Sequence, residues 1–109
     1  MERALVVGAG PAGVAAAQLL MRAGYDVSLA EPDADTARRT RDMLAQAGLA
    51  LRVADGPGDP AGAAIVVEAL EDEPEQRDAV LRHLSETAPA DSLLLSTALT
   101  GFSGRIVGF

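Results

Sequence analysis

The chain has 109 residues, enough for one domain with a single hydrophobic core but few for an enzyme that holds both a cofactor and a substrate. Hydrophobic residues make up 49% and aromatic residues 3%, so Ala, Val and Leu must build the core, as in helices packed on a buried parallel sheet. A formal net charge of -7 argues against nucleic acid or an anionic membrane as partner, and the absence of cysteine excludes disulfides and thiolate metal sites. We predict no metal site. No leader and no long apolar run precedes the first strand, so we expect a cytoplasmic protein.

Apolar patterning predicts alternating strands and helices along the chain. We expect strands at residues 4–7, 25–30, 49–53, 65–69, 93–96 and 105–109, and helices at 11–23, from a cap at Asp33 or Asp35 to Gly48, and at 73–88. A loop rich in turn-forming residues covers 55–62. This order predicts an α/β fold, a doubly wound parallel sheet of five to six strands with helices on both faces, as a single domain over residues 1–109.

Three glycines stand between the first predicted strand and the first predicted helix. In the stretch GAGPAG, Gly8 allows a tight turn out of the strand, Gly10 leaves room for a pyrophosphate at the backbone, and Gly13 lets the helix lie close to the strand. The free amides at the start of the helix, near Ala12 and Gly13, face the phosphates in such an arrangement. The fold is therefore expected to be Rossmann-like, with a dinucleotide as ligand.

An acid ends the second predicted strand. Glu31 lies 23 residues after Gly8, where a carboxylate can accept both ribose hydroxyls of an adenosine. The same carboxylate repels a 2'-phosphate, and Asp33 and Asp35 add to that repulsion. The sequence therefore favours NAD over NADP as cofactor.

A set of residues in the second half of the chain forms a family pattern: Val67, Glu68, Ala69, Asp72, Arg77, Ala88, Pro89, Asp91 and Ser96, together with the final RIVGF. In these residues the chain resembles the NAD-binding domain of 3-hydroxyacyl-CoA dehydrogenases. The resemblance implies an NAD-dependent oxidoreductase of fatty acid metabolism, with Asp72 and Arg77 close to the nicotinamide-side ribose. The predicted cofactor-binding residues are Gly8, Gly10, Pro11, Ala12, Gly13, Glu31, Pro32, Ala69, Leu70, Asp72, Arg77 and Ser96.

The chain departs from that family where the chemistry lies. It has one short helix where the family has a long helical pair, and STALTGFSG where the family has a Ser-Asn-Thr-Ser-Ser run. The family's catalytic histidine and its helical domain would follow Phe109. The sole histidine, His83, reads as a surface residue, and Glu68 reads as a carboxylate bonded to backbone amides or as a base with a raised pKa. No catalytic residue is predicted.

Three functions remain open. The first is an NAD(H)-binding domain that works beside a separate catalytic or helical domain, or as a homo-oligomer. The second is a Rossmann module with a structural or interaction role and no turnover. The third is part of an FAD-binding domain, because residues 8–31 read like the start of FAD-dependent oxidoreductases, with Pro11, Ala12 and the terminal Glu31.

Overall fold

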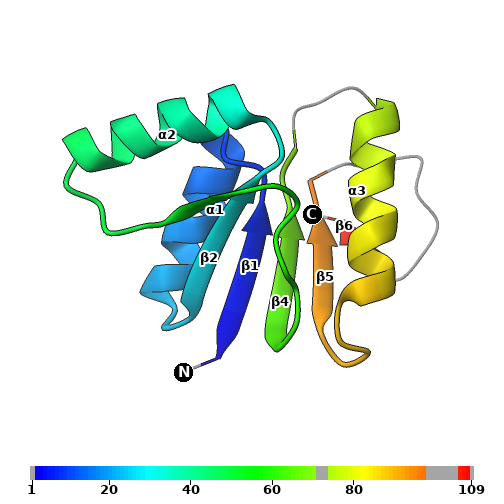
Figure 1. Ribbon diagram of the computed structural model, residues 1–109. Helices are drawn as coiled ribbons and strands as arrows, with labels where there is room; N and C mark the ends of the chain where they lie inside the picture. Colours follow the sequence, from blue (N-terminus) through cyan, green and yellow to red (C-terminus); the bar gives the residue numbers. More distant parts are fainter. Residues whose placement is uncertain (1, 71–73, 98–105, 109) are drawn as a thin grey trace.

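The computed structural model describes residues 2–70, 74–97 and 106–108, which form a layered α/β fold (Figure 1). In chain order the elements are β1 (Arg3–Val7), α1 (Pro11–Arg22), β2 (Asp26–Glu31), α2 (Ala34–Gln46), β3 (Val53–Asp55), β4 (Ala63–Glu68), α3 (Pro74–Thr87), β5 (Leu93–Ser96) and β6 (Ile106–Gly108). All strand pairs are parallel, and the strand order is β3-β2-β1-β4-β5-β6. The order reverses between β1 and β4, as the predicted doubly wound Rossmann-like fold requires.

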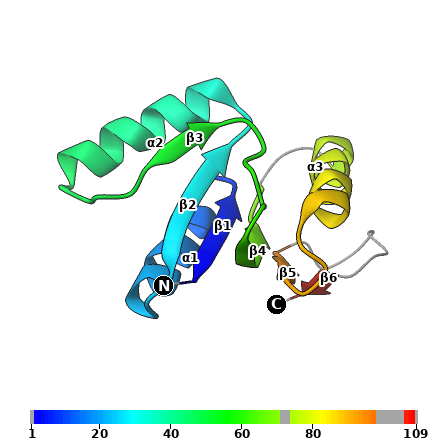
Figure 2. The ribbon, with the colours of Figure 1, turned by 60° about the horizontal axis from the view of Figure 1, so that its bottom comes forward.

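Two apolar cores lie on the two faces of the sheet. Alternate residues of β1 point to opposite faces, so Leu5 belongs to one core and Val6 to the other. Leu84 of α3 packs into the first core, and Ala17 of α1 and Leu44 of α2 pack into the second. Helices therefore cover both faces, with α1 and α2 on one side and α3 on the other (Figure 2). Among the described segments, no helix combines the length and apolar character needed to cross a membrane.

The third strand is shorter and later than the sequence indicates. We expected it at residues 49–53, but the structure pairs Val53–Asp55 with the end of β2. Leu49 is 43% exposed, so its apolar character reflects no buried strand. Arg41 of α2 fixes the observed position, since its Nε donates to the Val53 carbonyl at 2.9 Å and its Nη2 lies 2.9 Å from a carboxylate oxygen of Asp55. The other described elements agree with the prediction to within two residues.

The second helix begins at a side-chain cap. Of the two candidate acids, Asp33 is the N-cap: its carboxylate accepts the backbone N–H of Thr36 at 3.0 Å and the Thr36 hydroxyl at 2.6 Å. The hydroxyl bond first, and then the backbone bond, hold the pKa of Asp33 below its ordinary value. The folded state thus favours the charged carboxylate at this position.

This cap gives a pH-dependent prediction. Because the pKa of Asp33 is lowered on folding, its contribution to stability is present above its ordinary pKa and is lost as the pH falls through the lower, folded value. Asp33→Asn keeps the acceptor oxygen but cannot carry a charge. Wild type should be more stable than this variant at about pH 7, and the difference should shrink towards about pH 3. Urea unfolding of both proteins at the two pH values measures the difference, and a gap independent of pH would contradict the role of the charge.

Candidate functional site

Two of the three glycines are required by packing. Gly8 has φ 113°, and a Cβ at that position would lie 2.6 Å from both the carbonyl carbon and the carbonyl oxygen of Ala69. A Cβ on Gly13 would lie 1.6 Å from the Gly8 carbonyl oxygen. The glycine loop, the start of α1 and the end of β4 are therefore in backbone contact, and no side chain fits between them.

Gly10 is different, because its backbone does not require glycine. Its φ of -75° and ψ of -173° are open to any residue. Gly10 is the N-cap of α1, and no side chain makes a capping hydrogen bond there. Pro11 has no N–H, so the amides of Ala12 and Gly13 are the donors left without an intrahelical partner in the first turn.

The starts of α1 and α2, which cover the same face of the sheet, also differ in charge. The first turn of α2 contains Asp35 and is capped by Asp33, whereas the first turn of α1 contains no acid and has no side-chain cap. No acid within the first turn of α1 itself therefore offsets the partial positive charge at its start. An anion at this position would meet two amide donors and the positive end of the helix dipole.

Glu31 is the last residue of β2 and turns its carboxylate towards the glycine loop. The side chain is buried, with 4% of its surface exposed. Oε1 accepts the amide of Ala9 at 2.8 Å, and Oε2 accepts the amide of Asp33 at 2.9 Å. A carboxylate has about four acceptor positions, so each oxygen keeps capacity for one further donor. Pro32, the next residue, is exposed.

A second acidic side chain, Glu68, is buried at the end of β4. Its Oε2 accepts the amide of Leu70 at 2.5 Å, and its Oε1 accepts the hydroxyl of Ser96, at the end of β5, at 2.5 Å. Arg77 of α3 donates to the Leu70 carbonyl, and its Nε lies 3.7 Å from Oε2 of Glu68. Glu68 is 0% exposed, so the carboxylate ties together β4, β5 and α3. Two roles were expected for Glu68, and this geometry agrees with the first, a carboxylate that accepts a hydrogen bond from a backbone amide.

The predicted site residues fall into two groups at the carboxyl edge of the sheet. The glycine loop and Glu31 follow β1 and β2, while Ala69, Leu70, Arg77 and Ser96 surround the ends of β4 and β5. Contact between Gly8 and Ala69 joins the groups at the point where the strand order reverses. In doubly wound folds this crevice is where ligands bind. Asp72 lies outside the described residues, and His83 is exposed on α3.

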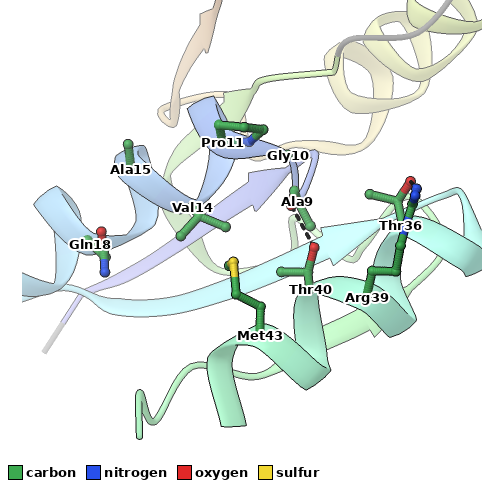
Figure 3. A pocket seen from close by; sticks show the side chains of 10 residues that line it. All are labelled: Ala9, Gly10, Pro11, Val14, Ala15, Gln18, Thr36, Arg39, Thr40 and Met43. Carbon is green, nitrogen blue, oxygen red and sulfur yellow. Dashed lines mark hydrogen bonds between the residues drawn. The ribbon is translucent and has the colours of Figure 1, made fainter. Parts of the chain in front are cut away.

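The structure also reveals a residue and a cavity that the sequence did not indicate. A cavity of about 450 Å³ lies between α1 and α2 (Figure 3), lined by Ala9, Gly10, Pro11, Val14, Ala15, Gln18, Thr36, Arg39, Thr40 and Met43. Thr40 is buried and donates its hydroxyl to the Ala9 carbonyl at 2.8 Å. The signal was available, since Thr40 is a polar residue on the apolar stripe of the helix. Among the described residues, no group of three or more His, Asp or Glu side chains could hold a metal ion.

Comparison with solved structures shows the same fold in several dehydrogenases. The 3-hydroxybutyryl-CoA dehydrogenase of Escherichia coli K12 is 19% identical, with a TM-score of 0.70 over 98% of this chain and 29% of its own. The 3-hydroxyacyl-CoA dehydrogenase of Archaeoglobus fulgidus is 18% identical, with a TM-score of 0.72 over 99% of this chain and 41% of its own. The chain thus spans less than half the length of these proteins.

A third similar structure is 5-formyl-3-hydroxy-2-methylpyridine 4-carboxylic acid 5-dehydrogenase, described as an NAD+ dependent dismutase. It is 24% identical, with a TM-score of 0.75 over 99% of this chain and 44% of its own. At these identities the likeness shows the fold alone, and it is the fold that the predicted resemblance implied. No curated protein matches the chain in sequence.

A family model gives a more specific assignment. The model described as FAD binding domain matches residues 2–93, which include the glycine loop, Glu31 and Glu68. This match covers most of the chain and differs from the dehydrogenase family that the second half resembles. The chain belongs to the family of FAD binding domains, built on the Rossmann-type dinucleotide-binding fold.

Proposed function

We propose that this chain binds the ADP half of a dinucleotide, with NAD(H) as the first candidate, and serves as the cofactor-binding part of a 3-hydroxyacyl-CoA dehydrogenase-like oxidoreductase. The observation that carries the proposal is the pairing of an uncapped helix start with a buried carboxylate. Gly10 begins α1 without a side-chain cap, and Glu31 lies beside the same loop, bonded to the Ala9 amide. Phosphate and ribose are the two groups that such a pair recognises.

The residues of the glycine loop and Glu31 have distinct roles in this proposal. The amides of Ala12 and Gly13 donate to the pyrophosphate, and Gly10 lets the phosphates approach the backbone. Glu31 accepts the ribose hydroxyls through the acceptor positions that the Ala9 and Asp33 amides do not use. Gly8 is assigned to the shape of the loop rather than to the ligand.

The second group of residues borders the other side of the crevice. Ala69 and Leu70 form the backbone wall next to Gly8, and the Glu68 network holds that wall in place. Arg77 and Ser96 support the wall from α3 and β5. We propose Pro32 and Asp72 as further contacts, from their places in the sequence.

Charge favours NAD(H) over NADP(H). A 2'-phosphate would lie next to the Glu31 carboxylate, and Asp33 and Asp35 carry negative charge at the neighbouring helix start. Arg39 of α2 is a nearby cation, and its Nη2 donates to the Thr36 hydroxyl at 3.4 Å. Two phosphate charges in this position would therefore be repelled.

FAD is the second candidate, because the family assignment supports it directly. FAD and NAD share the ADP half, so the glycine loop and Glu31 suit either one. The NAD+ dependent dismutase with the same fold supports NAD(H). A yellow flavin chromophore that stays bound to the purified protein would make FAD the first candidate for the cofactor.

Catalysis requires residues that the two groups of site residues described above do not supply. The carboxylate of Glu68 already accepts two hydrogen bonds and is fully buried, and His83 is exposed on the surface of α3. A hydride transfer needs a general base at the reacting oxygen. We propose that a separate catalytic or helical domain, or a partner chain, provides that base and the substrate site.

Substitution of Gly10 tests the proposed phosphate contact. Gly10→Val adds a branched side chain at a backbone conformation that valine tolerates, so the fold should remain intact while binding of NADH is lost. Ala23→Val, at the other end of the same helix, adds similar bulk and should bind NADH as wild type does. Circular dichroism checks the fold, and a fluorescence titration measures binding. Unchanged affinity in Gly10→Val would overturn the assignment of the phosphate site.

A further inference from the structure

The peptide groups on either side of Ala9 are each held by a side chain from another element. The Ala9 amide donates to Oε1 of Glu31, at the end of β2, at 2.8 Å. The Ala9 carbonyl accepts the hydroxyl of Thr40, in the middle of α2, at 2.8 Å (Figure 3). Ala9 is 2% exposed and Thr40 is 7% exposed, so water does not replace these bonds easily.

The bond from Thr40 also sets the direction of the next amide. The Ala9 carbonyl and the Gly10 N–H belong to one planar trans peptide, in which the two groups point in opposite directions. The Thr40 hydroxyl holds the carbonyl towards α2, so the Gly10 N–H points away from α2. The following peptide is fixed as well, because the Gly10 carbonyl accepts the amide of Val14 at 3.0 Å.

Thr40 uses its hydroxyl in an unusual way for a helical threonine. A threonine within a helix commonly donates to the carbonyl four residues earlier. Thr87 does so, donating to the His83 carbonyl at 2.7 Å on an exposed part of α3. Thr40 instead donates to a residue 31 positions earlier in the chain. Its single donor therefore serves the glycine loop and not its own helix.

We infer that Thr40 is a positioning residue for dinucleotide binding: its hydroxyl, through the Ala9 carbonyl, holds the peptide planes of the glycine loop in the orientation that receives the phosphates. The inference rests on the proposed function. Preorganised donors bind an anion more tightly than donors that must first be ordered. Loss of the hydroxyl should therefore weaken ligands that carry phosphate and leave the nucleoside part unaffected.

The test compares two ligands and three variants. Thr40→Val removes the hydroxyl with little change in shape, Thr40→Ser keeps it, and Thr87→Val removes a comparable hydrogen bond far from the loop. Dissociation constants for ADP and for adenosine are measured by NMR titration of the folded full chain. We expect Thr40→Val to weaken ADP about tenfold and adenosine less than about twofold, with Thr40→Ser and Thr87→Val close to wild type.

Other results separate the possible failures. Equal weakening of ADP and adenosine, or unchanged ADP binding in Thr40→Val, would overturn the positioning role, because a purely structural threonine lowers the melting temperature without changing the ADP-to-adenosine ratio. No binding of ADP by wild type would overturn the proposed function itself. If Thr40→Val does not fold, Thr40→Ala removes the same hydroxyl and is compared with Thr40→Ser in the same way.

Discussion

Replacing Glu68 with leucine is expected to lower the free energy of unfolding by about 3–5 kcal/mol, the usual cost of removing one partner from a buried charged network. The carboxylate is 0% exposed and accepts both the Leu70 amide and the Ser96 hydroxyl. Leucine fills the space but leaves those donors without their acceptor. It also leaves Arg77 without the carboxylate that lies 3.7 Å from its Nε. Thermal unfolding should show a melting temperature lower by more than about 10 °C.

Glu68→Gln is the matched control for this prediction. Its amide oxygen can still accept the Leu70 N–H, and its amide nitrogen can donate to the Ser96 oxygen, so the loss should be about 1 kcal/mol. A leucine variant as stable as wild type would show that the network contributes nothing to the fold. Equal losses in the two variants would show that the charge, and not the hydrogen bonds, carries the effect.

Replacing Gly8 with alanine should lower the free energy of unfolding about as much as Glu68→Leu does. Its φ of 113° strains any side chain, at a cost of about 1–3 kcal/mol, and the added Cβ would lie 2.6 Å from the backbone of Ala69. A backbone neighbour cannot turn aside as a side chain can, so overpacking adds about 1–3 kcal/mol. Melting curves measure the total, which should approach the loss in Glu68→Leu.

Gly24→Ala separates the two contributions. Gly24 also has a positive φ, 97°, but nothing lies within 4 Å of an added Cβ. This variant should therefore show only the strain, about 1–2 kcal/mol, or a melting temperature lower by about 5–15 °C. If Gly8→Ala and Gly24→Ala lose the same stability, the contact between the glycine loop and β4 is not tight.

The sequence was sufficient for the fold because the relevant signals are local. Apolar runs, the glycine loop and helix stop signals at Gly24 and Gly48 predicted the order of elements, and right-handed crossovers leave few ways to connect parallel strands. The predicted position of the third strand was wrong, because that position depends on the contacts of Arg41 with Val53 and Asp55. These contacts span 12 residues or more, and no local pattern reveals them. Leu49 contributed to the same error, because its apolar side chain indicated a buried strand but is 43% exposed.

The candidate site was predictable only in part. Motif spacing predicted Glu31 at the end of a strand, and the structure brings it to the glycine loop. The spacing predicted the tight turn at Gly8 and the close helix packing at Gly13, but not that the backbone of Ala69 also confines Gly8. The hydroxyl of Thr40 was missed as well, because its partner is distant in sequence. Thr40 stands out in the sequence as a polar residue on an apolar stripe, but the residue that it contacts follows only from the tertiary fold.

The choice between NAD(H) and FAD does not follow from the residues that we propose to bind the ADP half. Both cofactors share the ADP half, and the helix start at Gly10 and the carboxylate of Glu31 suit that half alone. Family membership supports FAD, whereas NAD(H) is the first candidate of our proposal. The two cofactors therefore have to be compared directly on the protein.

The most direct test is a titration of the purified chain with NADH, followed by nicotinamide fluorescence, with NADPH and FAD titrated in parallel. We expect saturable binding of NADH and much weaker binding of NADPH, because we propose that Glu31, which lies at the glycine loop, accepts the ribose hydroxyls, and its carboxylate would repel a 2'-phosphate. Tight binding of FAD without binding of NADH would support the proposed ADP site but would identify FAD as the cofactor. Absence of binding by all three dinucleotides would contradict the central claim and leave the chain with a structural role.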